Sequence, residues 1–281
     1  MNRRAELLAW LGNRMGKPPG WERVARWLAP PARFAADEEL CLVRDGYLFV
    51  TRPSLPIGWH VTLFGSYEPE LRAIFRAVLP PGGVALDVGA NTGWHTLLMA
   101  RLAGEAGRVL AVEPNPHVRI KLEENLAINR TTQVEVLACA LAEGAGTVQF
   151  MAPAADDAGS GDGHVAGAGE LARGDLVAVP TRALDDVAGE LARLDLVKID
   201  VEGYEWPVLR GAEATVARLR PHIVFEYDRD YAARGGGTPE LIAGYFARHR
   251  YRLHAVGRDV SRAIDAAHWP VSANVWAVPA R

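Results

Sequence analysis

A glycine loop at the end of a short apolar strand is the feature that most constrains how this chain can fold. The apolar segment Val84–Val88 has the length of a buried strand and runs into Asp87-Val88-Gly89-Ala90-Asn91-Thr92-Gly93. Glycines allow the backbone to turn sharply and to approach a ligand without a Cβ atom in the way. A helix is expected directly after the loop, and its N-terminus presents unpaired N–H groups. The segment therefore predicts the ligand-binding turn of an α/β sheet.

Strands and helices alternate regularly around this loop, from about residue 69 onward. Apolar residues at helical spacing predict helices over residues 70–79, 94–102, 116–128, 206–219 and 239–249. Short apolar runs predict strands over residues 84–88, 109–112, 134–137, 194–201, 222–225, 252–256 and 275–278. Such alternation is typical of a mostly parallel sheet with helices on both faces. We therefore expect an α/β domain over residues 63–281.

Two segments depart from this alternation. Residues 1–62 are expected to form an N-terminal extension, with two short amphipathic helices and a small hairpin that turns at Asp45-Gly46. Residues 151–175 are rich in Ala, Gly and Asp and contain few large apolar side chains, so they predict a flexible surface loop. Strands over residues 147–150 and 176–179 flank this loop and would form a hairpin inserted into the α/β pattern.

Charge and composition narrow the class of partner. The chain has 31 basic and 34 acidic residues and a formal net charge of −3, which argues against nucleic acid as a partner. Its two cysteines, Cys41 and Cys139, are too few for a disulfide framework or a zinc site, and Cys139 is expected to be a buried apolar residue. Because there is also no apolar run long enough to span a membrane, we expect a cytoplasmic protein.

The N-terminal residues 1–30 carry six basic and two acidic side chains, with tryptophans among them. Two interpretations of this segment are open. It can be a helical hairpin that docks on the main domain or on the second subunit of a homodimer. It can also be a peripheral membrane contact, or an element that recognises the substrate.

An acidic residue ends the next strand, in the sequence Val112-Glu113-Pro114-Asn115. A carboxylate at this place in such folds accepts hydrogen bonds from both hydroxyls of a ribose; the alternative is an ordinary carboxylate near a helix N-terminus. A dinucleotide would require a Gly-x-Gly-x-x-Gly loop, whereas Asn91 stands where the second glycine would fall. S-Adenosylmethionine has an adenosine but no pyrophosphate, so the loop and Glu113 favour it as the cofactor. A nicotinamide-dependent oxidoreductase remains the alternative.

A charged strand end later in the chain supplies further candidates. On a strand, Lys198, Asp200 and Glu202 would point to one face. A buried lysine must be paired, so we expect Asp200, Asp87 or Glu226 to be its partner. Sites in open α/β sheets lie at the carboxyl ends of the strands, which makes Asp200, Glu202 and Glu226 candidate catalytic groups. The alternative is a structural ion pair, with Glu202 near the start of the next helix.

Two histidines are also candidate functional groups. His95 directly follows the glycine loop, where it faces either the cofactor or the packing between helices. His164 lies within the expected loop over residues 151–175 and is expected to be a solvated surface histidine. It would act as a base only if that loop closed over a substrate.

The order and spacing of these motifs resemble the FkbM family of class I methyltransferases, over residues 63–279. Besides the glycine loop and Glu113, the resemblance rests on residues 65–68, 196–205, 223–226 and 274–279. It implies a Rossmann-like fold with a seven-stranded, mostly parallel sheet whose last strand is antiparallel. It also implies methylation of a hydroxyl on a sugar, glycolipid, polyketide or related metabolite. Residues 1–40 and 151–175 are not covered by the family's pattern.

The resemblance adds roles for individual residues. The backbone of the glycine loop would hold the amino-acid end of S-adenosylmethionine, Glu113 the ribose, and Ala140 and Leu141 the adenine. The expected cofactor-binding residues are Glu68, Asp87, Gly89, Ala90, Asn91, Gly93, Glu113, Pro114, Asn115, Ala140 and Leu141. The expected catalytic residues are Asp200, Glu226, Glu202, Lys198 and His95, with Asp200 as the base.

Two alternatives to this assignment are open. No metal is expected, but Asp200, Glu226 and Asp228 lie where adjacent strands end and have the oxygen ligands that magnesium prefers. A non-catalytic scaffold that keeps the cofactor-binding fold is the other alternative.

Overall fold

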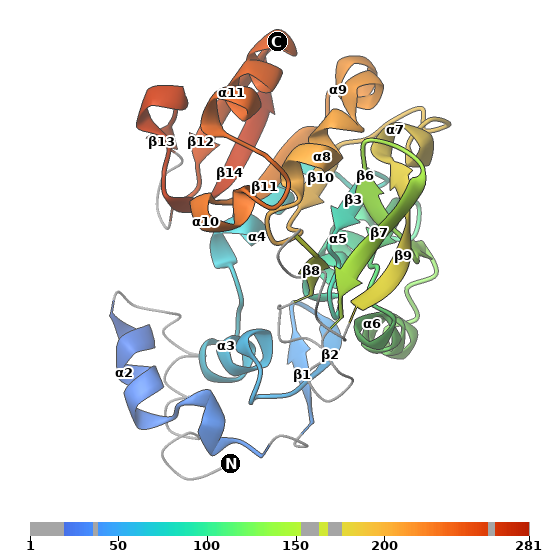
Figure 1. The fold of residues 1–281 in the computed structure, drawn as a ribbon. Helices are drawn as coiled ribbons and strands as arrows, with labels where there is room; N and C mark the ends of the chain where they lie inside the picture. The colour runs from blue at the N-terminus through green and yellow to red at the C-terminus, as the bar shows by residue number, and fades with distance from the viewer. Residues whose placement is uncertain (1–19, 36–38, 153–162, 168–175, 258–261, 281) are drawn as a thin grey trace.

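The computed structural model describes residues 20–35, 39–152, 163–167, 176–257 and 262–280 (Figure 1). The first of the two expected N-terminal helices and most of the expected loop over 151–175 lie outside these residues. Within the described part of the chain, no helix is long and apolar enough to cross a membrane.

An eight-stranded sheet forms the centre of the described fold, in the order β13-β12-β14-β11-β10-β3-β4-β5. The strands are β3 (Val84–Val88), β4 (Arg108–Val112), β5 (Val134–Leu137), β10 (Leu196–Ile199), β11 (His222–Asp228), β12 (Tyr251–Ala255), β13 (Arg262–Ala263) and β14 (Ser272–Pro279). Strands β5, β4, β3, β10 and β11 run parallel, whereas β14 is antiparallel to β11 and β12. All seven strands expected from the sequence are present, but the sheet contains one more strand than expected. The eighth strand, β13, has two residues at the sheet edge, too few for any periodic pattern.

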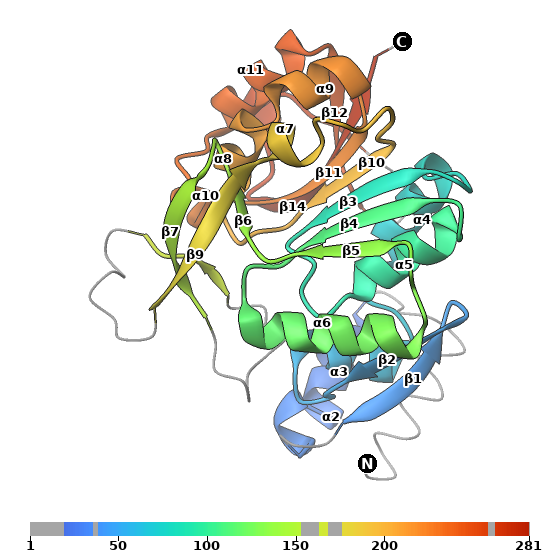
Figure 2. The ribbon, with the colours of Figure 1, turned by 90° about the vertical axis from the view of Figure 1, so that its right-hand side faces the viewer.

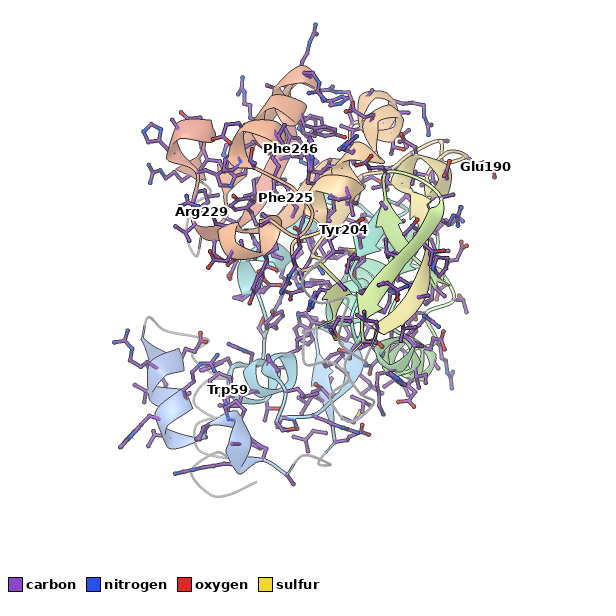
Figure 3. The ribbon with its side chains drawn as sticks, in the orientation of Figure 1. Trp59, Glu190, Tyr204, Phe225, Arg229 and Phe246 are labelled. Atoms are coloured by element: carbon purple, nitrogen blue, oxygen red, sulfur yellow. The ribbon has the colours of Figure 1, made fainter. Side chains whose placement is uncertain are left out.

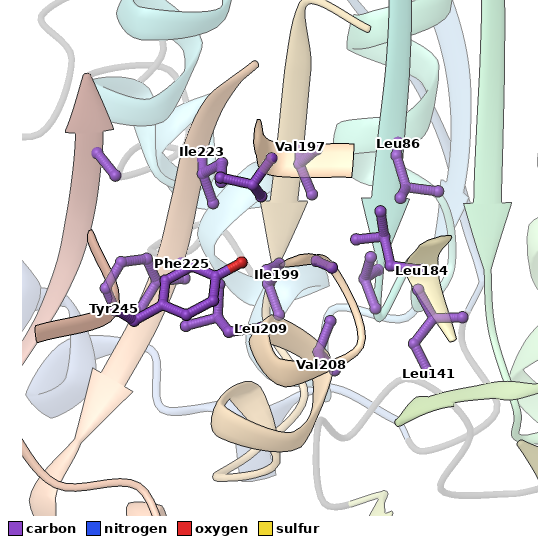
Figure 4. Close-up of a cluster of buried hydrophobic side chains, with 14 of the residues drawn as sticks. Leu86, Leu141, Leu184, Val197, Ile199, Val208, Leu209, Ile223, Phe225 and Tyr245 are labelled. Carbon is purple, nitrogen blue, oxygen red and sulfur yellow. The ribbon is translucent and has the colours of Figure 1, made fainter. Parts of the chain in front are cut away.

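Helices cover both faces of this sheet, as expected (Figure 1 and Figure 2). One face carries α4 (Pro69–Val78), α5 (Trp94–Ala103) and α6 (Pro116–Ile128). The other carries α7 (Leu184–Val187), α8 (Glu205–Arg210), α9 (Glu213–Leu219), α10 (Arg229–Ala232) and α11 (Pro239–Arg248). Ile223 and Phe225 of β11 pack in the second layer, shown in Figure 4, whereas Val224 between them packs in the first. This alternation is what a strand buried on both faces requires.

Two helical segments differ from expectation. The helix expected over 206–219 is divided into α8 and α9 at Gly211, where a Cβ atom would collide with the carbonyl oxygen of Ala142. Helix α3 (Pro56–Phe64) was not expected at all. Six of its nine residues are buried, so its apolar side chains surround the helix and give no helical periodicity in the sequence.

The described part of the N-terminal extension contains a hairpin that packs against α6 and a helix that packs against α3. Strands β1 (Leu40–Arg44) and β2 (Tyr47–Thr51) form the expected hairpin, with positive φ at Asp45 and Gly46. The N–H of Val50 donates to the side-chain oxygen of Asn125 on α6 at 2.7 Å. Helix α2 (Trp21–Leu28) and a 3₁₀ turn, Pro31–Arg33, lie before the hairpin, and α2 packs on α3. The domain boundary expected at residue 62 falls inside α3.

A second sheet of four strands flanks the central one, in the order β6-β9-β7-β8. Its strands are β6 (Ala140–Ala142), β7 (Gly146–Met151), β8 (His164–Val165) and β9 (Leu176–Ala183). Strands β7 and β9 form the expected inserted hairpin. His164 was expected to be a solvated surface histidine, and this was wrong. The residue lies in β8, pairs with Met151 and is only 9% exposed. Val165 beside it packs against Phe150, an apolar contact that the Gly-rich composition of the segment concealed.

Candidate active site

A cavity of about 350 Å³ lies where β3, β4 and β10 end, beside β11. This is the edge at which α/β sheets bind ligands, and the volume is in the range of small-molecule sites. Of the expected site residues, only Asp87 and Gly93 do not line it. The others that do are Glu68, Gly89, Ala90, Asn91, His95, Glu113, Pro114, Asn115, Ala140, Leu141, Lys198, Asp200, Glu202 and Glu226.

The glycine loop lets the backbone approach the cavity closely. Gly89 has a φ of 78°, and a Cβ atom there would collide with the carbonyl oxygen of Asp200. Every N–H from residue 89 to residue 93 already has a partner within the protein, including Val112 O for Gly89 and Ala90 at 3.0 Å. The loop is therefore held in shape before any ligand binds. A ligand in the cavity can therefore lie close to the backbone of the loop, but the N–H groups of residues 89–93 already donate hydrogen bonds within the protein.

Gly93 has a structural role in the turn before α5 and does not line the cavity. It has a φ of 95° and precedes α5, and a Cβ atom there would lie 2.7 Å from the side chain of Leu122. The expectation that Gly93 borders the cofactor is corrected accordingly: glycine is required here by the turn and by packing against α6.

Glu113 joins the glycine loop to the segment before α6. Its two carboxylate oxygens accept hydrogen bonds from the N–H of Asn91 at 2.9 Å and the N–H of Asn115 at 2.8 Å. Burial raises the pKa of Glu113 to about 7, although these two bonds act in the opposite direction. Each oxygen keeps a lone pair for a further donor from the cavity. Glu113 is not the cap of α6, because Asn115 caps that helix by accepting from the N–H of His117.

Lys198 is buried between two carboxylates. Its Nζ lies 3.1 Å from Asp200 and 3.5 Å from Asp87, and it donates to the carbonyl oxygen of Gly89 at 3.0 Å. Two of its three expected partners are thus confirmed. Burial alone would lower the pKa of Lys198, but the charges of Asp200 and Asp87 outweigh it and raise the pKa above its usual value.

Asp87 lies beneath the loop and has no exposed surface. Its second oxygen accepts a hydrogen bond from the hydroxyl of Thr96 on α5 at 2.6 Å. The expectation that Asp87 contacts the cofactor is therefore corrected. Asp87 acts one layer below the cavity, where it holds Lys198 and the start of α5 in place.

Asp200 and Glu226 form a coupled pair of carboxyl groups in the cavity wall. The charge of Asp200, together with burial and a shared hydrogen bond, raises the pKa of Glu226 to about 10. Burial acts to raise the pKa of Asp200 as well, but the charge of Lys198 outweighs it and keeps that pKa below its usual value. These opposite shifts favour a pair that shares one proton at neutral pH, with Asp200 the more acidic of the two carboxyl groups.

Glu202 completes a group of three carboxylates, since one of its oxygens lies within 4.8 Å of one oxygen each of Asp200 and Glu226. The sequence had suggested Asp200, Glu226 and Asp228 as possible magnesium ligands, and the structure corrects this set by placing Glu202 in the group in place of Asp228. Asp228 is not part of the group, because its side chain caps α10 by accepting from the N–H groups of Asp230 and Tyr231.

His95 and Glu68 are joined across the cavity wall. The Nε2 of His95 lies 2.8 Å from one oxygen of Glu68, and Asn274 of β14 donates to the other oxygen at 2.9 Å. Burial raises the pKa of Glu68, but the hydrogen bond and charge of His95 outweigh it and lower the pKa. The ring of His95 also packs on Phe75 of α4, with centroids 5.5 Å apart. His95 thus lines the cavity and also packs between helices.

Several aromatic and apolar residues of the cavity were missed from the sequence. They are Tyr67, Trp94, Phe150, Val165, Tyr204 and Tyr231. Tyr67 and Trp94 stand beside the recognised motifs and could have been found there; the indole N–H of Trp94 donates to the carbonyl of Tyr67 at 3.1 Å. Phe150 and Val165 come from the second sheet, and only the tertiary fold brings them to the cavity.

The fold and the cavity define a class I, S-adenosylmethionine-dependent methyltransferase. The residues fit this cofactor: Glu113 offers paired acceptors, Ala140, Leu141 and Phe150 an apolar wall, and Asp200 negative charge. The family model described as the methyltransferase FkbM domain matches residues 87–253, more than half of the chain, so the chain belongs to the FkbM methyltransferase family. The alternative of a nicotinamide-dependent oxidoreductase is thereby removed.

Two relatives in sequence are similar over limited parts of their length. The AMB antimetabolite synthetase AmbE of Pseudomonas aeruginosa is 33% identical over 210 residues, which are 63% of this chain and 10% of that protein. A protein-L-isoaspartate O-methyltransferase of Triticum aestivum is 31% identical over 88 residues, 30% of this chain and 37% of that one. The chain thus spans well under half of either relative.

The similar solved structures of methyltransferases have lower sequence identity to this chain than the two relatives above. A methyltransferase FkbM from Methylobacillus flagellatus has 15% identity and a TM-score of 0.45, covering 77% of this chain and 52% of that one. A SAM-dependent O-methyltransferase from Thermotoga maritima has 12% identity and a TM-score of 0.44, covering 88% of each chain. Similarity at this level does not carry substrate or mechanism from one protein to another.

Proposed function

We propose that this chain transfers the methyl group of S-adenosylmethionine to a hydroxyl of a sugar, glycolipid, polyketide or related metabolite. The observation that carries the proposal is a carboxylate in the cavity wall, Asp200, which Lys198 holds in its ionised form. A hydroxyl is a poor nucleophile until its proton is drawn away, so O-methylation needs such a base. The wheat relative is by name an O-methyltransferase of protein L-isoaspartate, so its name supports transfer to an oxygen atom and says nothing of a hydroxyl acceptor.

Residues from four parts of the fold would hold the cofactor. Glu113 would bind the ribose hydroxyls, and Ala140, Leu141 and Phe150 would pack against the adenine. The backbone at Gly89 would border the amino-acid end. S-Adenosylmethionine supplies an activated methyl group on a positively charged sulfur when it is bound. The negative charge of Asp200 in the same cavity suits that cation.

Asp200 would remove the proton of the acceptor hydroxyl. Glu226 beside it carries a proton at neutral pH and can donate a hydrogen bond to the acceptor oxygen or to Asp200. Lys198 remains fixed behind the pair and compensates the charge of Asp200. The side chain of Asp200 is 29% exposed, so the proton can pass from the carboxyl pair to solvent after transfer.

A methyl-transfer assay with labelled S-adenosylmethionine tests this proposal. Sugars, glycolipids and polyketides with free hydroxyls are offered in turn, and the product is examined by mass spectrometry and NMR. A methyl ether is expected. Labelled products methylated only at nitrogen or carbon would overturn the hydroxyl acceptor without touching membership of the family.

A further inference from the structure

The outward face of α2 carries an exposed tryptophan beside arginines. Trp27 is 78% exposed and Val24 is 46% exposed, and the exposed side chains of Arg23 and Arg26 flank them. The helical repeat places Arg23, Val24 and Trp27 along one side of the helix. Figure 1 shows α2 at the edge of the molecule, at the end opposite α11. Such a side-chain pattern on an exposed helix face fits a partner that binds both an aromatic ring and a positive charge.

The inward face of α2 is firmly attached. Ala25 is buried in a cluster with Trp59 and Leu63 of α3. The indole N–H of Trp59, which is labelled in Figure 3, donates to the carbonyl of Ala29 at 2.7 Å. The guanidinium of Arg26 lies 5.0 Å from the centroid of the Trp59 ring. These contacts hold α2 on α3, so Trp27 and Val24 lie on the solvent-exposed face of a helix whose position is fixed.

The N-terminal segment that contains α2 has a positive formal charge in the sequence. Residues 20–35 contain three basic side chains, Arg23, Arg26 and Arg33, and one acidic side chain, Glu22. Residues 1–30 contain six basic and two acidic side chains, in a chain whose net charge is −3. Positive charge is thus concentrated in this segment. Tryptophan favours the boundary between water and lipid, and basic side chains are attracted to anionic head groups.

We propose that α2 docks this chain on an anionic lipid bilayer, with Trp27 and Val24 in the interface and Arg23 at the head groups. A second copy of the chain is a poorer occupant. Two exposed apolar side chains cover far less area than a stable protein interface buries, and the like charges of two such faces would repel. A bilayer requires neither a large patch nor shape complementarity.

Docking through α2 has a consequence for the cavity, which rests on the proposed function. Helix α3 contacts α2 through Trp59, and its first residues, Pro56 and Ile57, line the cavity. One short helix therefore connects the lipid-facing surface to the site.

Co-sedimentation of the 281-residue chain with vesicles tests the docking without any assay of methyl transfer. Vesicles of phosphatidylcholine alone are compared with vesicles that also contain phosphatidylglycerol. The chain is expected to bind the anionic vesicles and to be released by salt. Arg23→Glu should weaken binding about fivefold or more, and Trp27→Ala should weaken it to a similar degree, on the scale of one basic side chain near an anionic surface.

Two control variants separate this face from general charge and exposure. Leu241→Ala removes an exposed apolar side chain from α11, and Arg252→Glu changes the net charge as Arg23→Glu does, but on β12. Both should bind as the unchanged chain does. The proposal is overturned if anionic vesicles are not bound, or if Arg252→Glu weakens binding as much as Arg23→Glu. It is also overturned if analytical ultracentrifugation shows a dimer that Trp27→Ala dissociates.

Discussion

The ammonium group of Lys198 lies 3.1 Å from the carboxylate of Asp200, and both belong to the wall of the cavity. This contact decides how protons are distributed in the site. It lowers the pKa of Asp200, and the charge of Asp200 in turn raises the pKa of Glu226 to about 10. An acidic carboxyl group and a neighbouring carboxyl group with a raised pKa are thereby placed side by side.

Replacing Glu113 should weaken cofactor binding. Glu113→Ala removes both acceptors offered to the ribose and should lose about 1–3 kcal/mol of binding free energy for S-adenosylmethionine or its demethylated product. Because burial raises the pKa of Glu113 to about 7, affinity of the unchanged protein should also fall as the pH drops below that value. Titration calorimetry measures both effects. Glu123→Ala, an exposed glutamate on α6, is the control and should bind normally; equal affinity for Glu113→Ala would contradict the assignment.

Replacing Glu226 should change how stability depends on pH. Its pKa is raised on folding from 4.5 to about 10, so between these values the unfolded chain releases a proton that the folded chain retains. Stability is then fully present below the unfolded pKa and is lost as the pH rises, by less than the limit of about 1.4 kcal/mol per pH unit because the side chain is partly exposed. Glu226→Gln has no such proton, so it should gain stability relative to the unchanged protein as the pH rises.

Urea unfolding of both proteins at a series of pH values measures this difference in the free energy of unfolding. Glu105→Gln replaces an exposed carboxyl on the surface and serves as the control, with a constant difference expected across the series. If the difference for Glu226→Gln is equally constant, Glu226 does not hold the proton, and Asp200 has no neutral neighbour at neutral pH.

Removal of metal ions should leave turnover unchanged. The three carboxylates Asp200, Glu202 and Glu226 are close enough to bind a cation. However, Lys198 already neutralises Asp200, and a cation would have to displace the proton of Glu226. Turnover is measured before and after treatment with a chelator. Loss of activity that magnesium restores would show that the acidic group is a metal site.

The sequence predicted most of the central fold because its signals there are local. The bounds of β3, α6 and β5 were predicted to the residue. Each is either a short apolar run between turns or a helix that begins with Asn115-Pro116, a capping residue followed by proline. The glycine loop and Glu113 could be predicted for the same reason, since spacing along the chain determines their place in the fold.

The remainder depends on contacts between distant segments. Helix α3 is buried on several sides and has no periodic pattern, and His164 is buried because a two-residue strand pairs with β7. Phe150 reaches the cavity only through the second sheet. Asp87 was expected at the cofactor because of its place in the motif, but a motif does not say which side of the loop a side chain occupies. Its burial follows from pairing with Lys198 and Thr96.

The rate of methyl transfer by Asp200→Asn tests the central claim most directly. Asparagine keeps the size of the side chain but cannot accept the proton, so turnover should fall about a hundredfold or more, while affinity for S-adenosylmethionine stays within a few-fold. Asp228→Asn, at the end of β11 and outside the carboxyl group of three, should turn over normally. If Asp200→Asn transfers methyl groups at the normal rate and only its melting temperature falls, Asp200 is a structural partner of Lys198 and the account of the base is wrong.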